Sequence, residues 1–444
     1  IIPQKWTNML ANFRAANLYP SDTGANPVVT PEMRDNDTDL ARHGGAVAAT
    51  FTLKLYNGNT GGAGTIYYTT DGTDPRVAWT DAVGATAQVY STPVLLGTPR
   101  MIKTRLLNNG VWSALDSAFF LVDSEAASAS NLTISKIHYH TANPSTAELN
   151  AGFNDDGMFE FVELMNIGTK SIDLSGITFS IGISFVFTDS MPYRILPPGQ
   201  RVLIVKNPAA FQFRYGTGLP VAGVFISGSL DNSGERLQLL AKNGSVIQDF
   251  SYDDAAPWTV LPDGNGPSLV LIRPSTNNTL VSNGANWRVS VSANGTPSSG
   301  SPGVDDRLLY STWRAASFTA GEAADPLISD PTADPDADGA SNLVEYARGT
   351  NPKSFDLPAF PTFAIESISA QNYGVIRYRY RLAAENAVLT PESSADLVSW
   401  SAAATTALAG THQNDASYSA AARANTSASG DAMRFLRLNV QYQP

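Results

Sequence analysis

Short runs of alternating apolar and polar residues, separated by glycine, proline and asparagine, recur along most of this chain of 444 residues. Residues 47–55 (VAATFTLKL) and 374–381 (GVIRYRYR) are typical of these runs. Side chains on a β-strand alternate between the two faces of a sheet, so such runs predict strands that bury one face. The 35 glycines and 27 prolines favour frequent turns over long helices. The pattern therefore predicts an all-β protein.

The length exceeds what one compact core usually reaches, so we expect several domains in series. Strands at this spacing are typical of tandem immunoglobulin-like β-sandwich domains. The expected segments are a helix and linker over 1–44, a sandwich over 45–123, a second sandwich over 131–303, a calcium-loop segment with a short helix over 308–352, and a C-terminal β domain over 358–444. A polar linker over residues 124–130 separates the first two sandwiches.

The N-terminal segment differs from the rest of the chain. Apolar residues at helical spacing run from Trp6 to Phe13 and predict a short helix that ends before Pro20. Residues 27–39 are interpreted as an exposed linker. The sequence begins at Ile1 without a leader, which favours a processed product or the C-terminal portion of a longer protein.

Composition excludes several kinds of function. The chain has no cysteine, which rules out disulfides, thiolate zinc sites and a cysteine nucleophile. Its formal net charge of −11 opposes binding to nucleic acid and to anionic lipid. No apolar stretch is long enough to span a membrane, so no membrane insertion is expected. Calcium is the partner that an acidic surface favours.

One segment carries recognisable chemistry. Asp334, Asp336, Asp338, Gly339 and Glu345 fit the twelve-residue calcium loop D-x-D-x-D-G-x5-E at every defined position. Calcium prefers about six to eight oxygen ligands, and alternating carboxylates supply three of them. The glycine permits the sharp turn that brings these carboxylates together.

The remaining ligands follow from the same spacing. The carbonyl of Ala340 is the expected backbone ligand, Asn342 contacts the metal directly or through water, and Glu345 closes the site with both oxygens. Pro331 and Pro335 stand where an EF-hand has its incoming helix, so we expect a one-sided, structural loop. The alternative is a solvated acidic turn.

Other polar groups are weaker candidates. His138 and His140 lie two residues apart on one strand and have metal-ligand spacing, but no third ligand accompanies them. Residues 155–157 (DDG) fit either a second calcium loop or a hairpin turn, and the turn is favoured. Glu160 and Glu163 resemble an acid/base pair, but their odd spacing places them on opposite faces of a strand.

The sequence contains no Ser-His-Asp signature, no phosphate-binding glycine loop and no nucleophile elbow, so no enzyme activity is expected. Residues 66–75 (IYYTTDGTDP) predict a strand that ends in an Asp-Gly hairpin turn. Trp79, Tyr67 and Tyr68 are expected to be exposed rings, which is the kind of surface on which sugars stack.

Two segments resemble known families. Residues 66–76 resemble the hairpin of the chitobiase/hexosaminidase C-terminal-type β domain. Residues 134–303 are similar to a bacterial lamin-tail domain, which implies an immunoglobulin-like sandwich without catalytic residues. The stretches that carry this second resemblance are 159–166 (FEFVELMN), 173–176 (DLSG), 196–199 (LPPG), 230–237 (LDNSGERL), 249–254 (DFSYDD), 266–269 (GPSL) and 286–288 (NWR).

The flanking segments carry further resemblances. Residues 334–352 are similar to the dockerin-like or thrombospondin-type-3-like calcium segment of surface proteins. Residues 392–400 (ESSADLVSW) and 434–437 (RFLR) resemble a C-terminal β domain of Verrucomicrobia-type exported proteins. The order of segments, with residues 2–6 (IPQKW), 18–20 (LYP) and 43–45 (HGG), resembles the region downstream of a CotH-like kinase domain, and that kinase domain is absent here.

These observations favour a non-catalytic structural or adhesive region of a secreted or cell-surface bacterial protein, stiffened by calcium. Its expected partners are other copies of itself or other cell-surface proteins, because sandwich edge strands can pair between chains. The alternative is a carbohydrate-binding accessory region of a larger extracellular enzyme, with glycans as the ligands.

Overall fold

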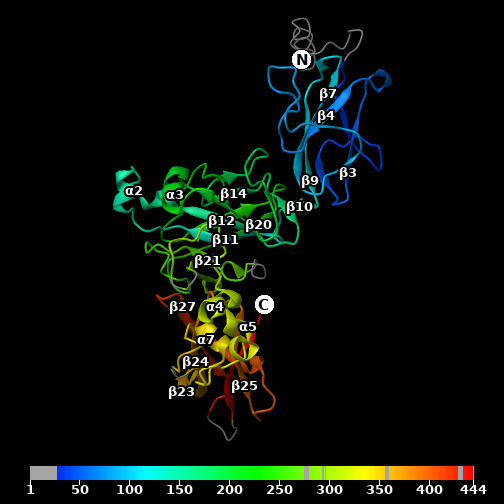
Figure 1. Ribbon diagram of the computed structural model, residues 1–444. Coiled ribbons are helices and arrows are strands. Elements are labelled where there is room, and N and C mark those ends of the chain that lie inside the picture. The colour runs from blue at the N-terminus through cyan, green and yellow to red at the C-terminus, as the bar shows by residue number, and fades with distance from the viewer. Residues whose placement is uncertain are drawn as a thin grey trace. The chain divides into compact units, whose positions relative to one another are not determined.

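The computed structural model describes residues 28–274, 280–292, 295, 297–355, 360–428 and 434–443 (Figure 1). Strands dominate this part of the chain and helices are short, which confirms the all-β prediction. The helix expected over residues 6–13 lies outside the described residues. None of the helices described is both long and apolar enough to cross a membrane.

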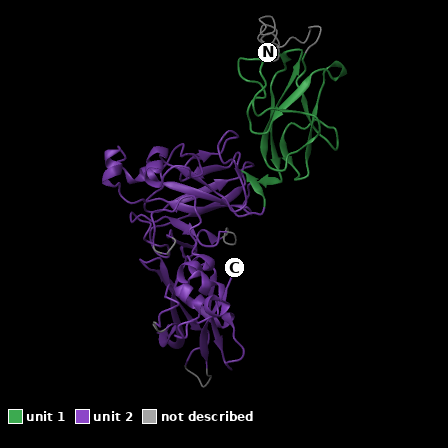
Figure 2. Cartoon of the chain, in the orientation of Figure 1, with its two compact units in different colours: residues 1–126, 170–173 green, residues 127–169, 174–444 purple. Residues whose placement is uncertain are grey.

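The chain forms two compact units (Figure 2). Unit 1 contains the chain up to residue 126 together with residues 170–173, and unit 2 contains residues 127–169 and everything from residue 174 onward. Each unit has cores of its own.

Unit 1 is a small sandwich of two sheets. One sheet has the order β1 (Glu32–Asp35), β3 (Thr52–Tyr56), β6 (Val94–Leu95). The other has the order β2 (Gly45–Val47), β9 (Asp116–Val122), β7 (Arg100–Asn108), β4 (Thr65–Thr69), β5 (Gln88–Val89), and β8 (Val111–Trp112) also pairs with β7. Alternate residues of the strands, such as Leu53, Ile102 and Phe120, form the buried core between the sheets.

The first domain starts earlier than the sequence analysis expected. Residues 32–35, interpreted there as part of an exposed linker, form β1 and pair antiparallel with β3. Met33 stands opposite Leu55 and is 2% exposed. One apolar residue in a four-residue strand gives no detectable alternation, and the partner strand supplies the burial.

The linker expected over residues 124–130 is also partly a strand. Ser124–Ala126 form β10, which pairs in parallel with β13 (Ser171–Asp173). Beside this pair, the Lys170 ammonium lies 2.8 Å from the Asp123 carboxylate. This pairing explains why residues 170–173 belong to unit 1.

The Asp-Gly turn after β4 is not a tight hairpin. Asp71 accepts a hydrogen bond from the backbone amide of Thr73 (3.0 Å), and Gly72 has a positive φ of 79°. The strand that pairs with β4 on this side, β5, begins only at Gln88. Asp74 instead receives the guanidinium of Arg105 at 2.7 and 2.8 Å, which fixes the turn to the sheet.

The first part of unit 2 is a larger sandwich. Its six-stranded sheet has the order β18 (Val221–Val224), β17 (Arg201–Val205), β12 (Phe161–Asn166), β11 (Leu132–His138), β21 (Leu269–Leu271), β22 (Trp287–Val289). Its four-stranded sheet has the order β15 (Phe185–Val186), β14 (Thr178–Ile181), β19 (Arg236–Leu240), β20 (Val246–Ser251). The helices α2 (Thr146–Asn150) and α3 (Pro208–Tyr215) and the short strand β16 (Ile195–Leu196) lie in its connections.

The second part of unit 2 combines short helices with two further sheets. The helices are α4 (Tyr310–Ser317), α5 (Ala320–Ala324), α6 (Pro326–Ser329) and α7 (Asn342–Arg348). One sheet has the order β23 (Thr362–Ile368), β24 (Gln371–Arg381), β27 (Ser417–Ala424), β26 (Thr405–His412), and β25 (Ala387–Ser394) pairs with β28 (Phe435–Tyr442). Helix α7 packs against β24, β25 and β28 (Figure 1).

One apolar core joins the two parts of unit 2. It contains Val289 from β22, Trp313 from α4, Tyr346 from α7, and Ala383 and Ala387 from the C-terminal region. The helical segment therefore shares its core with both neighbouring sandwiches. It is not a separate module in the chain.

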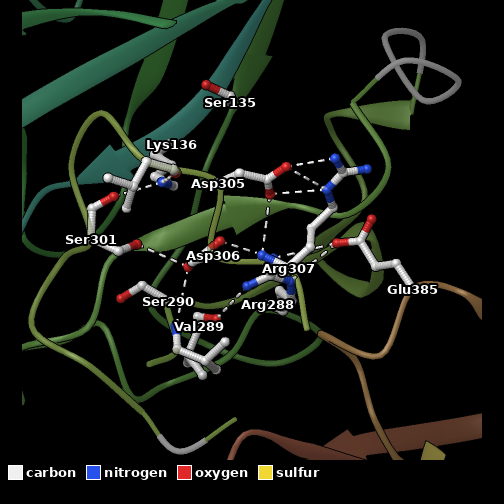
Figure 3. A network of polar contacts seen from close by, with 12 residues as sticks. Ser135, Lys136, Arg288, Val289, Ser290, Ser301, Asp305, Asp306, Arg307 and Glu385 are labelled. Carbon is white, nitrogen blue, oxygen red and sulfur yellow. Dashed lines mark hydrogen bonds and ion pairs between the residues drawn. The ribbon is translucent and has the colours of Figure 1, made fainter. Parts of the chain in front are cut away.

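A buried ionic network lies at the same junction (Figure 3). Arg288, which is 1% exposed, contacts Asp306 at 3.0 Å and Glu385 at 3.3 Å. Burial alone would raise the pKa of Asp306, but the positive charges of Arg288 and Lys136 lower it below its usual value. The network links the first sandwich of unit 2 to the start of the C-terminal region through buried charges.

Replacing Arg288 by methionine is expected to lower the free energy of unfolding by about 3–5 kcal/mol, because Asp306 and Glu385 then remain buried without the guanidinium that contacts both of them. Urea unfolding measures the change. The matched control is Arg236→Met, which breaks an exposed pair with Asp249 and is expected to cost less than about 1 kcal/mol. Equal losses of unfolding free energy in the two variants would show that the buried network stabilises the fold no more than an exposed ion pair does.

Candidate metal centre

Three aspartates come together in the loop between α6 and α7. Asp334, Asp336 and Asp338 each offer a carboxylate oxygen, and these oxygens lie within 4.8 Å of one another. They are the carboxylates that the spacing of the sequence predicted as ligands. Such a cluster can hold a cation, because three negative charges at this distance repel each other in its absence.

Backbone amides set the conformation of the loop. The amide of Gly339 donates to Asp334 (3.0 Å), that of Asp338 donates to Asp336 (3.2 Å), and that of Ala340 donates to Asp338 (2.8 Å). Gly339 has a φ of 91°, and a Cβ there would meet nothing within 4 Å. Glycine is therefore required by the backbone conformation and not by a lack of space.

The electrostatics of the loop favour a bound cation. Partial burial raises the pKa of Asp336, and the negative charges of Asp338 and Asp334 raise it further. Asp336 Oδ2 is buried and has no hydrogen-bond partner among the described residues. A buried acceptor of this kind costs free energy unless a donor or a cation satisfies it.

Asn342 and Glu345, the last two predicted side-chain ligands, lie on α7 and are fully buried. The Asn342 amide nitrogen donates to the carbonyls of Ile328 (2.7 Å) and Asp330 (2.9 Å), while its Oδ1 is buried without a hydrogen-bond partner among the described residues. Thr350 donates to Glu345 Oε1 at 3.5 Å. Glu345 does not belong to the three-aspartate cluster. Its ligand role and that of the Ala340 carbonyl stay predictions.

Helix α7 anchors the loop on the core. Leu343, Tyr346 and Ala347 are buried in the core that joins the two parts of unit 2. The Tyr346 hydroxyl donates to the carbonyl of Leu308. The loop therefore leads directly into a helix whose position is determined by packing.

The two histidines do not form a second centre. His138 is buried, lies 3.1 Å from the Tyr215 hydroxyl, and has its pKa lowered to about 3 by burial. His140 lies between Asp263 (2.5 Å) and Asp156 (3.4 Å). Among the described residues, no group of three ligating side chains includes either histidine.

The DDG segment is neither a hairpin turn nor an assembled calcium loop. Asp155 caps the short 3-10 helix Asp156–Phe159 by accepting a hydrogen bond from Gly157 (2.8 Å). Aspartate followed by glycine is common both in hairpin turns and in caps of this kind, so the sequence did not distinguish the two. No third ligand joins Asp155 and Asp156 within the described part of the chain.

Glu160 and Glu163 have different surroundings and do not form a pair. Glu163 is buried and accepts hydrogen bonds from Ser135 (2.8 Å) and Gly303 (2.7 Å). Glu160 accepts from the amide of Leu230 (2.8 Å), and burial raises its pKa to about 8.

Glu160 borders a polar cleft of about 790 Å³ that the sequence analysis did not find. The cleft is lined mainly by acidic side chains and amides, including Asp155, Asp231, Asn232 and Glu235. These residues come from separate segments of the chain. No local spacing in the sequence signals that they meet.

The three candidate sugar-stacking rings differ in exposure. Tyr68 was expected to be exposed, but it is 8% exposed, belongs to the core of unit 1 and donates to Gln88 (2.9 Å). Tyr67 packs against Trp112 with ring centroids 5.4 Å apart. Trp79 is 100% exposed. Adjacent strand residues point to opposite faces, so Tyr67 and Tyr68 cannot both face the solvent.

Two families match parts of the chain. The lamin tail domain family matches residues 125–254, which belong to the large sandwich of unit 2 except for residues 125–126 and 170–173. The family described as Fn3 associated matches residues 53–111, within the sandwich of unit 1. No curated protein and no solved structure matches the chain. The protein is therefore a modular β protein with a lamin tail domain and an Fn3-associated domain.

The raised pKa of Glu160 leads to a pH-dependent stability. The native state holds a proton on Glu160 up to a pH of about 8, whereas the unfolded chain releases it near the ordinary value of 4.5. Stability therefore falls as the pH rises through this window, by up to about 1.4 kcal/mol per pH unit.

Glu160→Gln cannot ionise and is expected to flatten this fall, measured as unfolding midpoints between pH 5 and 8. The control is Asp249→Asn, because the Arg236 hydrogen bond lowers the pKa of Asp249 to about 2 and so keeps it ionised throughout the window. An unchanged slope in Glu160→Gln would mean that Glu160 titrates normally.

Proposed function

We propose that this chain is a non-catalytic, calcium-stabilised structural or adhesive region of a secreted or cell-surface bacterial protein. The observation that carries the proposal is the cluster of Asp334, Asp336 and Asp338 on a loop anchored in the core of unit 2. The two matching families support a modular β protein. The proposal also includes the resemblances of individual segments to chitobiase-type, dockerin-like and CotH-associated regions of bacterial surface proteins.

The chemistry of the donor atoms favours calcium. All the candidate ligands are oxygens, supplied by the three aspartates, Asn342 and Glu345, with the Ala340 carbonyl as the backbone ligand. Hard oxygen ligands without histidine or cysteine suit calcium better than zinc or copper. Asp336 Oδ2 and Asn342 Oδ1, buried oxygens to which none of the described residues donates, fit a bound cation. The cation would supply charge neutralisation and a link between the loop and α7.

A structural role fits the surroundings of the loop better than a sensor role. Helix α6 spans only Pro326–Ser329 and ends before Pro331, so the loop has no long incoming helix to move. The outgoing helix α7 is buried on one side. Calcium at this position would stiffen the region where the two parts of unit 2 share a core.

The proposed partners are other copies of the chain or other cell-surface proteins. Sandwich edge strands offer unpaired backbone groups that can pair with another chain. The net charge of −11 opposes nucleic acid as a partner.

Calcium is expected to raise the thermal midpoint of unit 2. At a free calcium concentration of about 100 times Kd, binding to the native state alone adds about 2.7 kcal/mol to stability. Asp336→Asn keeps the shape of the side chain, removes one charge, and is expected to abolish most of this shift. The control Asp37→Asn makes the same charge change at an exposed position and is expected to retain it. A calcium shift that survives in Asp336→Asn, or a wild type without any shift, would contradict the proposal.

The second candidate function, carbohydrate binding, is favoured by Trp79 alone. This fully exposed indole has a positive φ of 64°, which is uncommon for a bulky residue and marks a position that the surrounding loop holds. If the ring stacks on neutral sugars, Trp79→Ala is expected to abolish binding to neutral glycans on an array. Phe355→Ala removes another exposed ring and is expected to change nothing. Wild-type protein that binds no neutral glycan would end this candidate.

A further inference from the structure

A row of arginines lies along one face of β24. Arg377, Arg379 and Arg381 alternate with Tyr378 and Tyr380. Every second residue of a strand points to the same face, so the Cα atoms of the three arginines follow one another on that face at intervals of roughly 7 Å. A regular row of positive charge is unexpected in a chain with a net charge of −11.

The neighbouring strand leaves space beside this row. Ser417, Ser419 and Ala421 of β27 stand opposite Arg381, Arg379 and Arg377. Because these side chains are small, a trough of about 730 Å³ lies over the sheet. Its rim carries further polar groups from α7, the residues after α7, β23 and β26, namely Arg348, Thr350, Thr362 and Thr411.

The arginines are only partly neutralised by the protein. Arg377 pairs with Glu366 at 2.6 Å and Arg379 pairs with Asp415, and both arginine side chains are 53% exposed. Exposed pairs of this kind are weak and exchange partners readily. Arg381 donates to the carbonyl of Gly349 (3.3 Å) but has no ion-pair partner among the described residues, and burial lowers the pKa of its guanidinium. Its charge is therefore held at the trough at a cost that a bound anion would offset.

We propose that this trough binds an extended acidic polysaccharide, whose carboxylate or sulfate groups pair with Arg377, Arg379 and Arg381. The planar guanidinium matches carboxylate and sulfate oxygens in a two-bond geometry. The hydroxyls of Ser417, Ser419 and Thr411 suit the hydroxyls of a sugar chain. The inference names a ligand class and a site beyond the structural role proposed above.

The trough suits a glycan better than a single-stranded nucleic acid. Nucleic-acid channels combine positive charge with open aromatic faces on which bases stack. Here the guanidinium of Arg348 lies over the ring of Phe360 at 4.5 Å from its centroid. The ring of Tyr378, which also lines the trough, stacks on that of Tyr380 with centroids 5.9 Å apart.

The test is titration of the full chain, at constant calcium and low salt, with four probes of similar length. These probes are a heparin oligosaccharide, an oligogalacturonate, a neutral cello-oligosaccharide and a single-stranded oligodeoxynucleotide. Binding of the heparin or the galacturonate probe is expected, weakening as salt rises. The two acidic probes distinguish sulfate from carboxylate as the recognised group.

The variant Arg377→Gln/Arg379→Gln changes two exposed side chains and is expected to weaken binding of the acidic glycan at least tenfold. Arg381→Gln is expected to act in the same direction. The control Arg34→Gln/Arg236→Gln removes the same charge from ion pairs elsewhere and is expected to leave the affinity within twofold.

Three results would overturn the inference. They are no binding of either acidic glycan, an equal loss in the control variant, and tighter binding of the oligodeoxynucleotide than of both acidic glycans. Asp336→Asn and Trp79→Ala are expected to retain acidic-glycan binding when folded. The experiment therefore distinguishes the proposal of an acidic-glycan site from the proposals of a calcium site and of a neutral-glycan site.

Discussion

The contact of Arg288 with Asp306 and Glu385 organises unit 2. A guanidinium removed from water is costly, and it is tolerated only where carboxylates are held beside it. Arg288 lies in β22 and Glu385 precedes β25, so their ionic contact holds two segments 97 residues apart in one arrangement. The apolar core around Trp313 and Tyr346 forms beside the same junction. The arrangement of the two parts of unit 2 thus depends on burying Arg288, Asp306 and Glu385 together.

Helix α7 connects the two sites proposed for this protein. Its first turns carry Asn342 and Glu345 of the metal loop, and its last residue, Arg348, lines the arginine trough. The buried face between them packs on β24, the strand that carries the arginine row. A cation that orders the loop would therefore also steady one wall of the trough, without any need for a large movement.

The residues that could be predicted are those whose function depends on local spacing. The three aspartates meet as expected because a twelve-residue loop brings its own ligands together. The prediction failed where burial came from distant strands. Met33 is buried by β3, and Tyr68 is buried in the core of unit 1. None of these partners leaves a mark in the neighbouring sequence.

The sequence by itself determined the β class of the fold, the spacing of the three aspartates in their loop and the alternation of arginine and tyrosine in β24. Each of these properties is contained in two to twelve consecutive residues. Backbone geometry alone then places the side chains on one face of a strand or around one loop. Only the tertiary structure decided that Arg288 meets Glu385, that small residues of β27 open a trough beside the arginines, and that Glu160 keeps its proton. Pairing, open space and desolvation depend on residues brought together by folding, and no short stretch of the chain contains that information.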